Sequence, residues 1–203
     1  GDALAVARML AEKGYKVSAF LFNISNDLSA DCVVNRDRLK ENQNVKEFTE
    51  VTIKFDPPEL TADMLVVDGL FGSGLNKPIA GGFASLIKYI NQSDAQVVSI
   101  DIPSGLMAED NSSNVRANII QADMTLSLHQ RKLAFLFADT QEFLGRVKVL
   151  DIGLSREYIK TTDTEFSILD ESTVRVLIHQ RNEFAHKGSM GNALIVAGSY
   201  GMA

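Results

Sequence analysis

The sequence predicts an α/β fold, a three-layer α/β/α sandwich around a mainly parallel sheet, and two observations lead to it. Two short apolar runs, residues 64–67 and 97–100, end in the carboxylates Asp68 and Asp101, and each carboxylate is followed by a glycine-containing turn. Continuous apolar runs bounded by turn signals are typical of buried parallel strands. Strand-like runs also alternate with helix-length connections, as in βαβ units.

Each element follows from its local pattern. Helices are expected where apolar residues recur every three or four positions, and strands where apolar and β-branched residues run together. The expected helices cover residues 3–12, 26–44 (capped by Asn26 or Asp27), 83–91 and 170–179 (capped by Asp170 or Ser172). The expected strands cover residues 17–22, 51–55, 64–68, 97–101, 123–128, 146–152 and the apolar part of 193–199.

Composition excludes several classes of protein. The chain has 203 residues, of which 45% are hydrophobic, enough for a sizeable core. A net charge of −6 argues against nucleic acid or an anionic membrane as the partner. No apolar run approaches the roughly 20 residues that span a bilayer. The single cysteine, Cys32, excludes an internal disulfide and is expected in the core, which fits a reducing, cytoplasmic location.

The two carboxylates mark the candidate site, because open parallel sheets bind ligands beyond the carboxyl ends of their strands. Asp101 faces that crevice on one interpretation, and on the other it caps its own turn by accepting backbone amides, as in most Asp-x-Pro-Ser sequences. The glycine loop 72–78 lets backbone amides approach a phosphate, and Lys77 reaches phosphate or assists proton transfer. The alternative is an ordinary glycine turn with a solvated lysine.

Three motifs, taken together and in this order, resemble the YjeF N-terminal domain, the NAD(P)H-hydrate epimerase family. They are Asp68-x-Leu-Phe-Gly-x-Gly-Leu-x-Lys-Pro78, Val98-Ser-Ile-Asp-Ile-Pro-Ser-Gly105 and Val149-Leu-Asp-Ile-Gly153. Gly1-Asp2 matches the last two residues of that family's Asn-Asn-Gly-Gly-Asp loop. Further on, His186-Lys187-Gly188-x-x-Gly191 and residues 193–199 are similar to the opening of the NAD(P)H-hydrate dehydratase domain.

The resemblance implies a Rossmann-like fold and a role in nicotinamide nucleotide repair. Residues 1–160 are then an epimerase domain lacking its N-terminal part, and residues 164–203 the start of a dehydratase domain, with the polar stretch 155–163 as the boundary. We expect an internal fragment of a cytosolic bifunctional enzyme. Its epimerase part interconverts R and S NAD(P)HX, and its dehydratase part consumes the S form with ADP or ATP. Homo-oligomer formation is left open, as is activity of the chain by itself.

The resemblance also implies site residues. Asp101 and Lys77 are the expected catalytic residues, and Asp68 and Ser104 the expected ligands of a potassium ion, together with an asparagine that this chain lacks. The expected substrate-binding residues are Gly1, Asp2, Gly72, Ser73, Gly74, Leu75, Asn76, Lys77, Pro78 and Asp101. Two polar residues that follow a strand, His129 and Lys132, are expected on the surface, as is His179 on a helix.

The sequence is also compared with two other functions that this scaffold can carry. A non-catalytic binding or dimerisation module on the same scaffold is the main alternative, since fold does not imply function. Retention of Asp2, Asp68, Asp101 and Ser104 favours the enzyme. An NAD-dependent dehydrogenase is weaker, because the full glycine fingerprint and its ribose-binding acid are missing.

Overall fold

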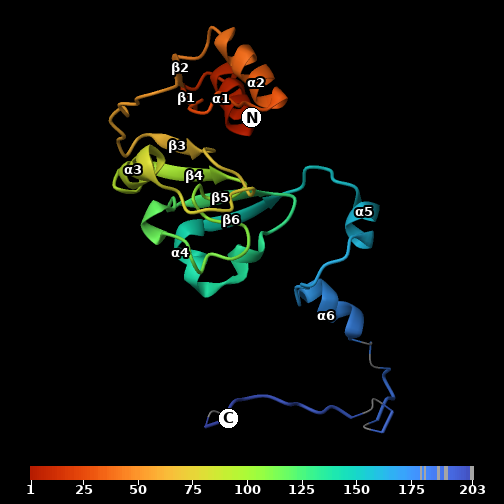
Figure 1. The fold of residues 1–203 in the computed structure, drawn as a ribbon. Coiled ribbons are helices and arrows are strands. Elements are labelled where there is room, and N and C mark those ends of the chain that lie inside the picture. The colour runs from red at the N-terminus through yellow and green to blue at the C-terminus, as the bar shows by residue number, and fades with distance from the viewer. Residues whose placement is uncertain (179, 181, 187, 190–191, 202–203) are drawn as a thin grey trace. The chain divides into compact units, whose positions relative to one another are not determined.

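The computed structural model describes residues 1–178, 180, 182–186, 188–189 and 192–201. His179, Lys187 and Gly191, which carried sequence predictions, lie outside these residues. The chain divides into two compact units, Gly1–Leu154 and Ser155–Ala203 (Figure 1).

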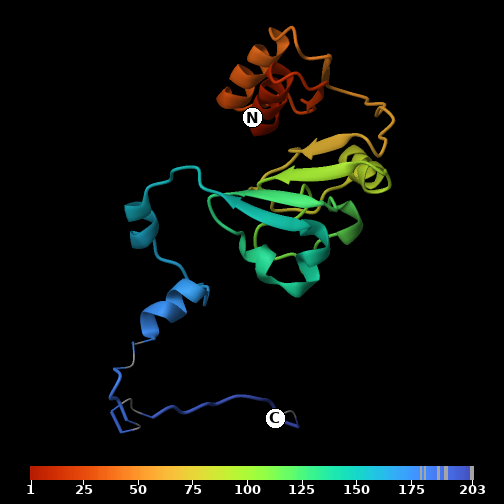
Figure 2. The same ribbon diagram turned by 180° about the vertical axis from the view of Figure 1, so that it is seen from behind.

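The first unit holds every strand pairing of the two parallel sheets and confirms the predicted Rossmann-like α/β fold. One sheet has the order β1-β2, and the other has the order β3-β4-β5-β6, whose four arrows are seen in Figure 2; all neighbours are parallel. The strands are β1 (Ser18–Phe22), β2 (Glu47–Val51), β3 (Leu65–Asp68), β4 (Gln96–Ile100), β5 (Met124–Leu128) and β6 (Arg146–Leu150). The helices are α1 (Asp2–Glu12), α2 (Ala30–Lys40), α3 (Gly81–Asn91) and α4 (Gln141–Leu144), with 3₁₀ helices η1 (Arg116–Asn118), η2 (Leu133–Leu136) and η3 (Ala138–Thr140).

Helices lie on both faces of the β1–β2 sheet. On one face Leu4 of α1 and Cys32 of α2 pack in one cluster with Ala19 of β1. Alternation along the strand turns Phe22 to the other face, where its ring contacts that of Phe83 of α3 at 5.7 Å between centroids. The three-layer arrangement therefore follows from side-chain contacts, and the prediction that Cys32 is packed in the core is confirmed.

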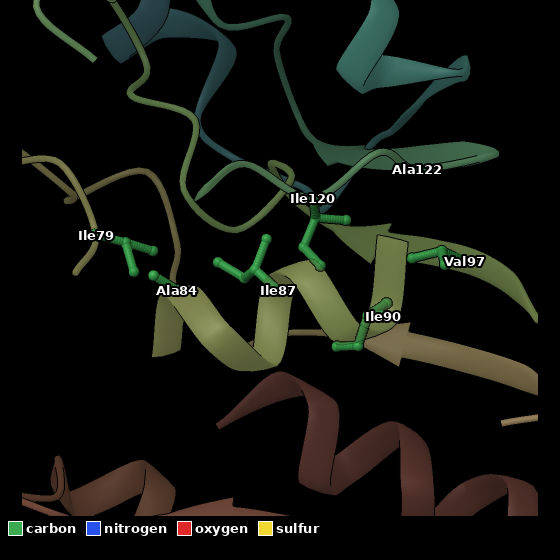
Figure 3. Close-up of a cluster of buried hydrophobic side chains, with 7 residues drawn as sticks. All are labelled: Ile79, Ala84, Ile87, Ile90, Val97, Ile120 and Ala122. Carbon is green, nitrogen blue, oxygen red and sulfur yellow. The ribbon is translucent and has the colours of Figure 1, made fainter. Parts of the chain in front are cut away.

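The core beneath α3 consists of aliphatic side chains at helical spacing. Ile87 is fully buried, and Ala84 and Ile90 lie one turn away on the same face of the helix (Figure 3). They pack against Val97 of β4 and against the segment that runs into β5. The whole cluster is Ile79, Ala84, Ile87, Ile90, Val97, Ile120 and Ala122.

The predicted strand over 51–55 is wrong: β2 covers Glu47–Val51. Pairing with β1 sets the end of this strand, because Phe22, the last residue of β1, pairs with Val51. The chain then leaves the ladder, Ile53 is exposed, and the Phe55 ring contacts Phe22 at 5.0 Å between centroids. The alternation of apolar and polar residues thus continues beyond the strand because Phe55 packs against the rings of Phe20 and Phe22.

The helix predicted over 26–44 is shorter, Ala30–Lys40. Ser29 caps it by accepting a hydrogen bond from the Cys32 amide at 3.3 Å. Asn26, an expected cap, instead adopts a left-handed conformation with φ 52° before the helix begins.

In the second unit the predicted cap at Asp170 is confirmed. Its side chain accepts from the Thr173 amide at 2.8 Å and begins α6 (Glu171–Leu177). The polar stretch 155–163 contains a helix that was not expected, α5 (Arg156–Thr161); the Ser155 side chain caps it by accepting a hydrogen bond from the Tyr158 amide, and none of its residues is buried.

The strand predicted within 193–199 is wrong. Residues 192–198 form no helix or strand, and Leu194, Ile195 and Val196 are exposed. A strand needs a neighbour to pair with its backbone, and no strand of the two sheets pairs with residues 193–198; Ser199 forms an isolated bridge. An apolar run alone was therefore insufficient to predict a strand here.

Across the part of the chain that the structure describes, every helix is too short or too polar to span a lipid bilayer.

Replacing Ile87 with Ala should lower the free energy of unfolding by about 2–5 kcal/mol, because it leaves a cavity in a closed core. Urea unfolding followed by circular dichroism measures the change. The control is Ile53→Ala, at a side chain that is 92% exposed, where a change within about 0.5 kcal/mol is expected. Equal losses in both variants would contradict this description of the core.

Candidate functional site

Polar residues follow four neighbouring strands at one edge of the larger sheet. Asp68 is the last residue of β3, and Asp101 follows β4 directly. His129 follows β5, and Asp151 follows β6. Because these strands are parallel neighbours in the order β3-β4-β5-β6, their carboxyl ends lie along the same edge. This is where such sheets bind ligands.

Asp68 is only 3% exposed, and its carboxylate accepts four hydrogen bonds. Oδ2 accepts from Ser99 Oγ at 2.7 Å and from the Ser104 amide at 2.8 Å. Oδ1 accepts from Ser104 Oγ at 2.5 Å and from the Leu70 amide at 3.3 Å. Burial raises the pKa of Asp68, and the bonds from Ser104 and Ser99 oppose that rise. Four donors fill the acceptor capacity of a carboxylate, so Asp68 joins two loops and leaves no lone pair for a ligand.

The Pro103-Ser104-Gly105 turn is held from two sides. The Phe71 amide donates to Ser104 Oγ at 3.0 Å, which ties the glycine loop to this turn. Gly105 has φ +98°, and a Cβ there would lie 2.2 Å from the Asn118 carbonyl oxygen. Asn118 Nδ2 in turn donates to the Ile79 carbonyl at 2.7 Å, just beyond the glycine loop. The two loops at this edge are therefore fixed to each other and to η1.

Asp101 has one occupied and one open carboxylate oxygen. Its backbone is left-handed, with φ 68°. Oδ1 accepts from the Leu128 amide at 3.1 Å and forms an ion pair with Lys132. Among the described residues, none donates a hydrogen bond to Oδ2. The amide that donates to Asp101 belongs to the neighbouring strand β5 and not to the turn that follows Asp101. The interpretation of Asp101 as a cap of its own turn therefore does not describe its contacts.

The surface placement predicted for Lys132 and His129 is wrong. The Lys132 side chain is 14% exposed and is paired with Asp101. The His129 side chain is equally covered, and its Nδ1 lies 3.3 Å from Asp151 Oδ1. Both residues follow the end of a strand, the same rule that singled out Asp68 and Asp101. Applied to β5, that rule would have found them.

The glycine loop is open toward solvent. A Cβ at Gly72 or Gly74 would meet no heavy atom within 4 Å, so a ligand can approach the backbone there. The Leu75 amide donates to the Gly72 carbonyl at 3.3 Å and closes the turn. Lys77 is exposed and makes no hydrogen bond or ion pair with the described residues. The structure thus leaves Lys77 free and does not bring it against Asp101.

The first turn of α1 lies beside Asp68. A Cβ on Gly69 would come within 2.8 Å of the Ala3 Cβ, so only glycine allows this close approach. Gly1 and Asp2, expected to bind substrate, are exposed at the same end of α1. A helix N-terminus presents amides without helical partners.

The described residues contain no group of three or more His, Cys, Asp and Glu side chains arranged to hold a metal ion. The oxygens of Asp68 and Ser104 are nevertheless of the type that hard cations prefer. The Ser104 hydroxyl has a second acceptor, the Phe71 carbonyl at 3.4 Å. If its proton turns to that carbonyl, Asp68 Oδ1 and Ser104 Oγ become available together as oxygen ligands of the kind that a hard cation takes.

Comparison with known proteins gives consistent matches. The family model described as YjeF-related protein N-terminus matches residues 1–134. The NAD(P)H-hydrate epimerase of Lentilactobacillus buchneri is 34% identical over 77% of this chain and 68% of that protein. The epimerase of Oenococcus oeni is 30% identical over 76% and 69%.

A second group of relatives is longer. The bifunctional NAD(P)H-hydrate repair enzyme Nnr of Coxiella burnetii is 30% identical over the whole chain, which covers 40% of that protein. The chain therefore spans about two fifths of the length of the bifunctional relatives that it matches.

Replacing Gly105 with Ala should destabilise the protein by about 1–3 kcal/mol, because the new Cβ meets the Asn118 carbonyl. Thermal unfolding measures the loss. The matched control is Gly82→Ala, where a Cβ meets nothing and alanine is the better helix former. Unchanged stability in Gly105→Ala would mean that the turn is not held as described.

Proposed function

The chain belongs to the YjeF-related N-terminal family, and from that membership we propose that it interconverts the R and S forms of hydrated NADH and NADPH. The names of its relatives support this reaction, among them the epimerases of 30% and 34% identity. The single observation that carries the proposal is the open Oδ2 of Asp101 at the carboxyl edge of the sheet, beside a carboxylate, Asp68, that is fully hydrogen-bonded.

The substrate dictates what the site must do. In hydrated NAD(P)H one ring carbon bears both a hydroxyl group and the ring nitrogen. Its configuration changes when hydroxide leaves and returns on the other face, or when the ring opens and closes. Both routes need a group that gives and takes a proton near that oxygen. Asp101 is the proposed group, acting through Oδ2, and its negative charge also favours a transient cationic ring.

The rest of the dinucleotide is proposed to lie along the exposed loops. Gly1 and Asp2 at the start of α1 and the loop Gly72, Ser73, Gly74, Leu75, Asn76, Lys77 and Pro78 are the proposed substrate-binding residues. The open space beside Gly72 and Gly74 supports a close approach of phosphate to the backbone. The exposed Lys77 ammonium supports a phosphate contact more directly than a catalytic role.

Potassium is part of the proposal. Asp68 and Ser104 would hold the ion, which when bound would supply a positive charge that offsets a buried carboxylate. Replacing choline chloride with KCl at constant ionic strength should raise the Tm of the protein by a few degrees, since a ligand that binds only the native state stabilises it. In Ser104→Ala the rise should be absent. The same Tm in both salts would contradict the site.

The longer relatives support a wider proposal for the whole protein. Residues 1–160 are proposed as the epimerase domain and residues 164–203 as the beginning of a dehydratase domain that uses ADP or ATP. With these activities, the whole protein is proposed to be a cytoplasmic enzyme that repairs a small-molecule cofactor.

Asp101→Asn should lower the rate of epimer exchange of purified R-NADHX by about 10²–10⁴-fold, the usual share of general acid–base catalysis. NMR or chiral separation follows the exchange in the natural full-length protein. The control is Asp94→Asn, which should keep the wild-type rate. Asp94 is exposed and lies two residues before β4 begins, at the end of the strand opposite to Asp101. A wild-type protein that binds the dinucleotide without speeding exchange would instead support the non-catalytic module.

A further inference from the structure

We propose that Lys132 is a positioning residue for the reaction: it fixes the orientation of the Asp101 side chain and directs its free oxygen, Oδ2, toward the substrate. This inference rests on the proposed function. It is carried by the Lys132–Asp101 ion pair, which joins the segment after β5 to the end of β4.

Lys132 is anchored by its own segment independently of Asp101. Its ammonium nitrogen lies 3.3 Å from Ser127 Oγ, 3.3 Å from the Leu128 carbonyl and 3.4 Å from the Gln130 carbonyl. Ser127 is itself fully buried and donates its proton to the Gln130 carbonyl at 2.6 Å, so its lone pairs face the ammonium. Three oxygens of one tight turn therefore surround the ammonium, whose three N–H groups are shared among them and Asp101 Oδ1.

That turn is rigidly attached to the sheet. The His129 amide donates to the Leu150 carbonyl at 2.7 Å, and the Gln130 amide to the Leu128 carbonyl at 2.7 Å. The positive charge of Lys132 is thus fixed in place by β5 and β6. Among the described residues, Asp101 is the one carboxylate that pairs with the Lys132 ammonium.

The consequence for Asp101 is an asymmetry between its two oxygens. Oδ1 is held by the Leu128 amide and by Lys132, and Oδ2 has no donor among the described residues. The Asp101 side chain is 16% exposed and the Lys132 side chain 14%, so solvent screens this pair less than a surface pair. Without Lys132, Asp101 keeps one neutral donor and loses both its counter-charge and its fixed orientation.

Lys132→Ala should reduce kcat for epimer exchange about 10–100-fold while KM for NADHX changes less than about threefold, because Lys132 acts on Asp101 and not on the substrate. Ethylammonium in the buffer should restore the rate saturably by filling the vacated space, and Lys132→Arg should retain part of it. The control is Lys148→Ala, an exposed lysine in β6, for which the kinetics should not change and ethylammonium should have no effect.

A double-mutant cycle shows whether Lys132 acts through Asp101. In the Asp101→Asn background, Lys132→Ala should cost nothing further, since residues that act as one unit are not additive. Thermal unfolding and dinucleotide binding of each variant show that it is folded.

Each outcome is distinct. A folded Lys132→Ala variant that keeps the wild-type rate, or losses that add in the double variant, would overturn the role of Lys132 while the epimerase activity stands. If neither ethylammonium nor Lys132→Arg restores the rate, Lys132 only stabilises the local structure. That result would also overturn its role as a positioning residue. If the wild-type protein fails to exchange the epimers, the proposed function falls, and this inference falls with it.

Discussion

The buried carboxylate of Asp68 is the interaction on which the arrangement of this edge depends. It connects the end of β3 to Ser99 inside β4 and to the Ser104 turn beyond it. Burying a carboxylate costs several kcal/mol. Hydrogen bonds to a charged group contribute about 1.5–3 kcal/mol each, so four of them offset that cost only when both loops are in place. The glycine loop and the turn below it are therefore coupled.

Asp68 and Asp101 occupy equivalent places on neighbouring strands, yet their surroundings give them different chemistry. Every lone pair of Asp68 is used within the protein, which suits a structural role or, after a turn of the Ser104 hydroxyl, a bound cation. Asp101 keeps one oxygen free and has a fixed positive partner, Lys132. A proton can be exchanged with a ligand only at the second carboxylate. This difference, more than the presence of two acids, supports the catalytic role proposed for Asp101.

Much of this arrangement follows from the sequence. The apolar runs before Asp68 and Asp101 located two neighbouring strands of the larger sheet, β3 and β4, and the parallel-sheet rule placed both carboxylates at the same end of these strands. Residue types also predicted the core position of Cys32 and the cap at Asp170. These features depend on local pattern, which a sequence displays directly.

The wrong predictions have a common physical cause: each concerns a feature that is set by residues far away in the sequence. The limits of β2 come from its pairing with β1, and among the described residues no strand pairs with residues 193–198. Lys132 looked like a surface lysine because its partner, Asp101, lies 31 positions earlier. A long side chain can reach back over a turn, and residue type alone does not indicate where it ends.

The most direct measurement is a crystal structure of the full-length protein with hydrated NADH bound. The hydroxyl of the hydrated ring should lie within hydrogen-bond distance, about 2.6–3.2 Å, of Asp101 Oδ2, while Oδ1 stays paired with Lys132. A ring bound elsewhere, or an Asp101 whose Oδ2 faces only water in the complex, would contradict the assignment of this carboxylate as the group that moves the proton.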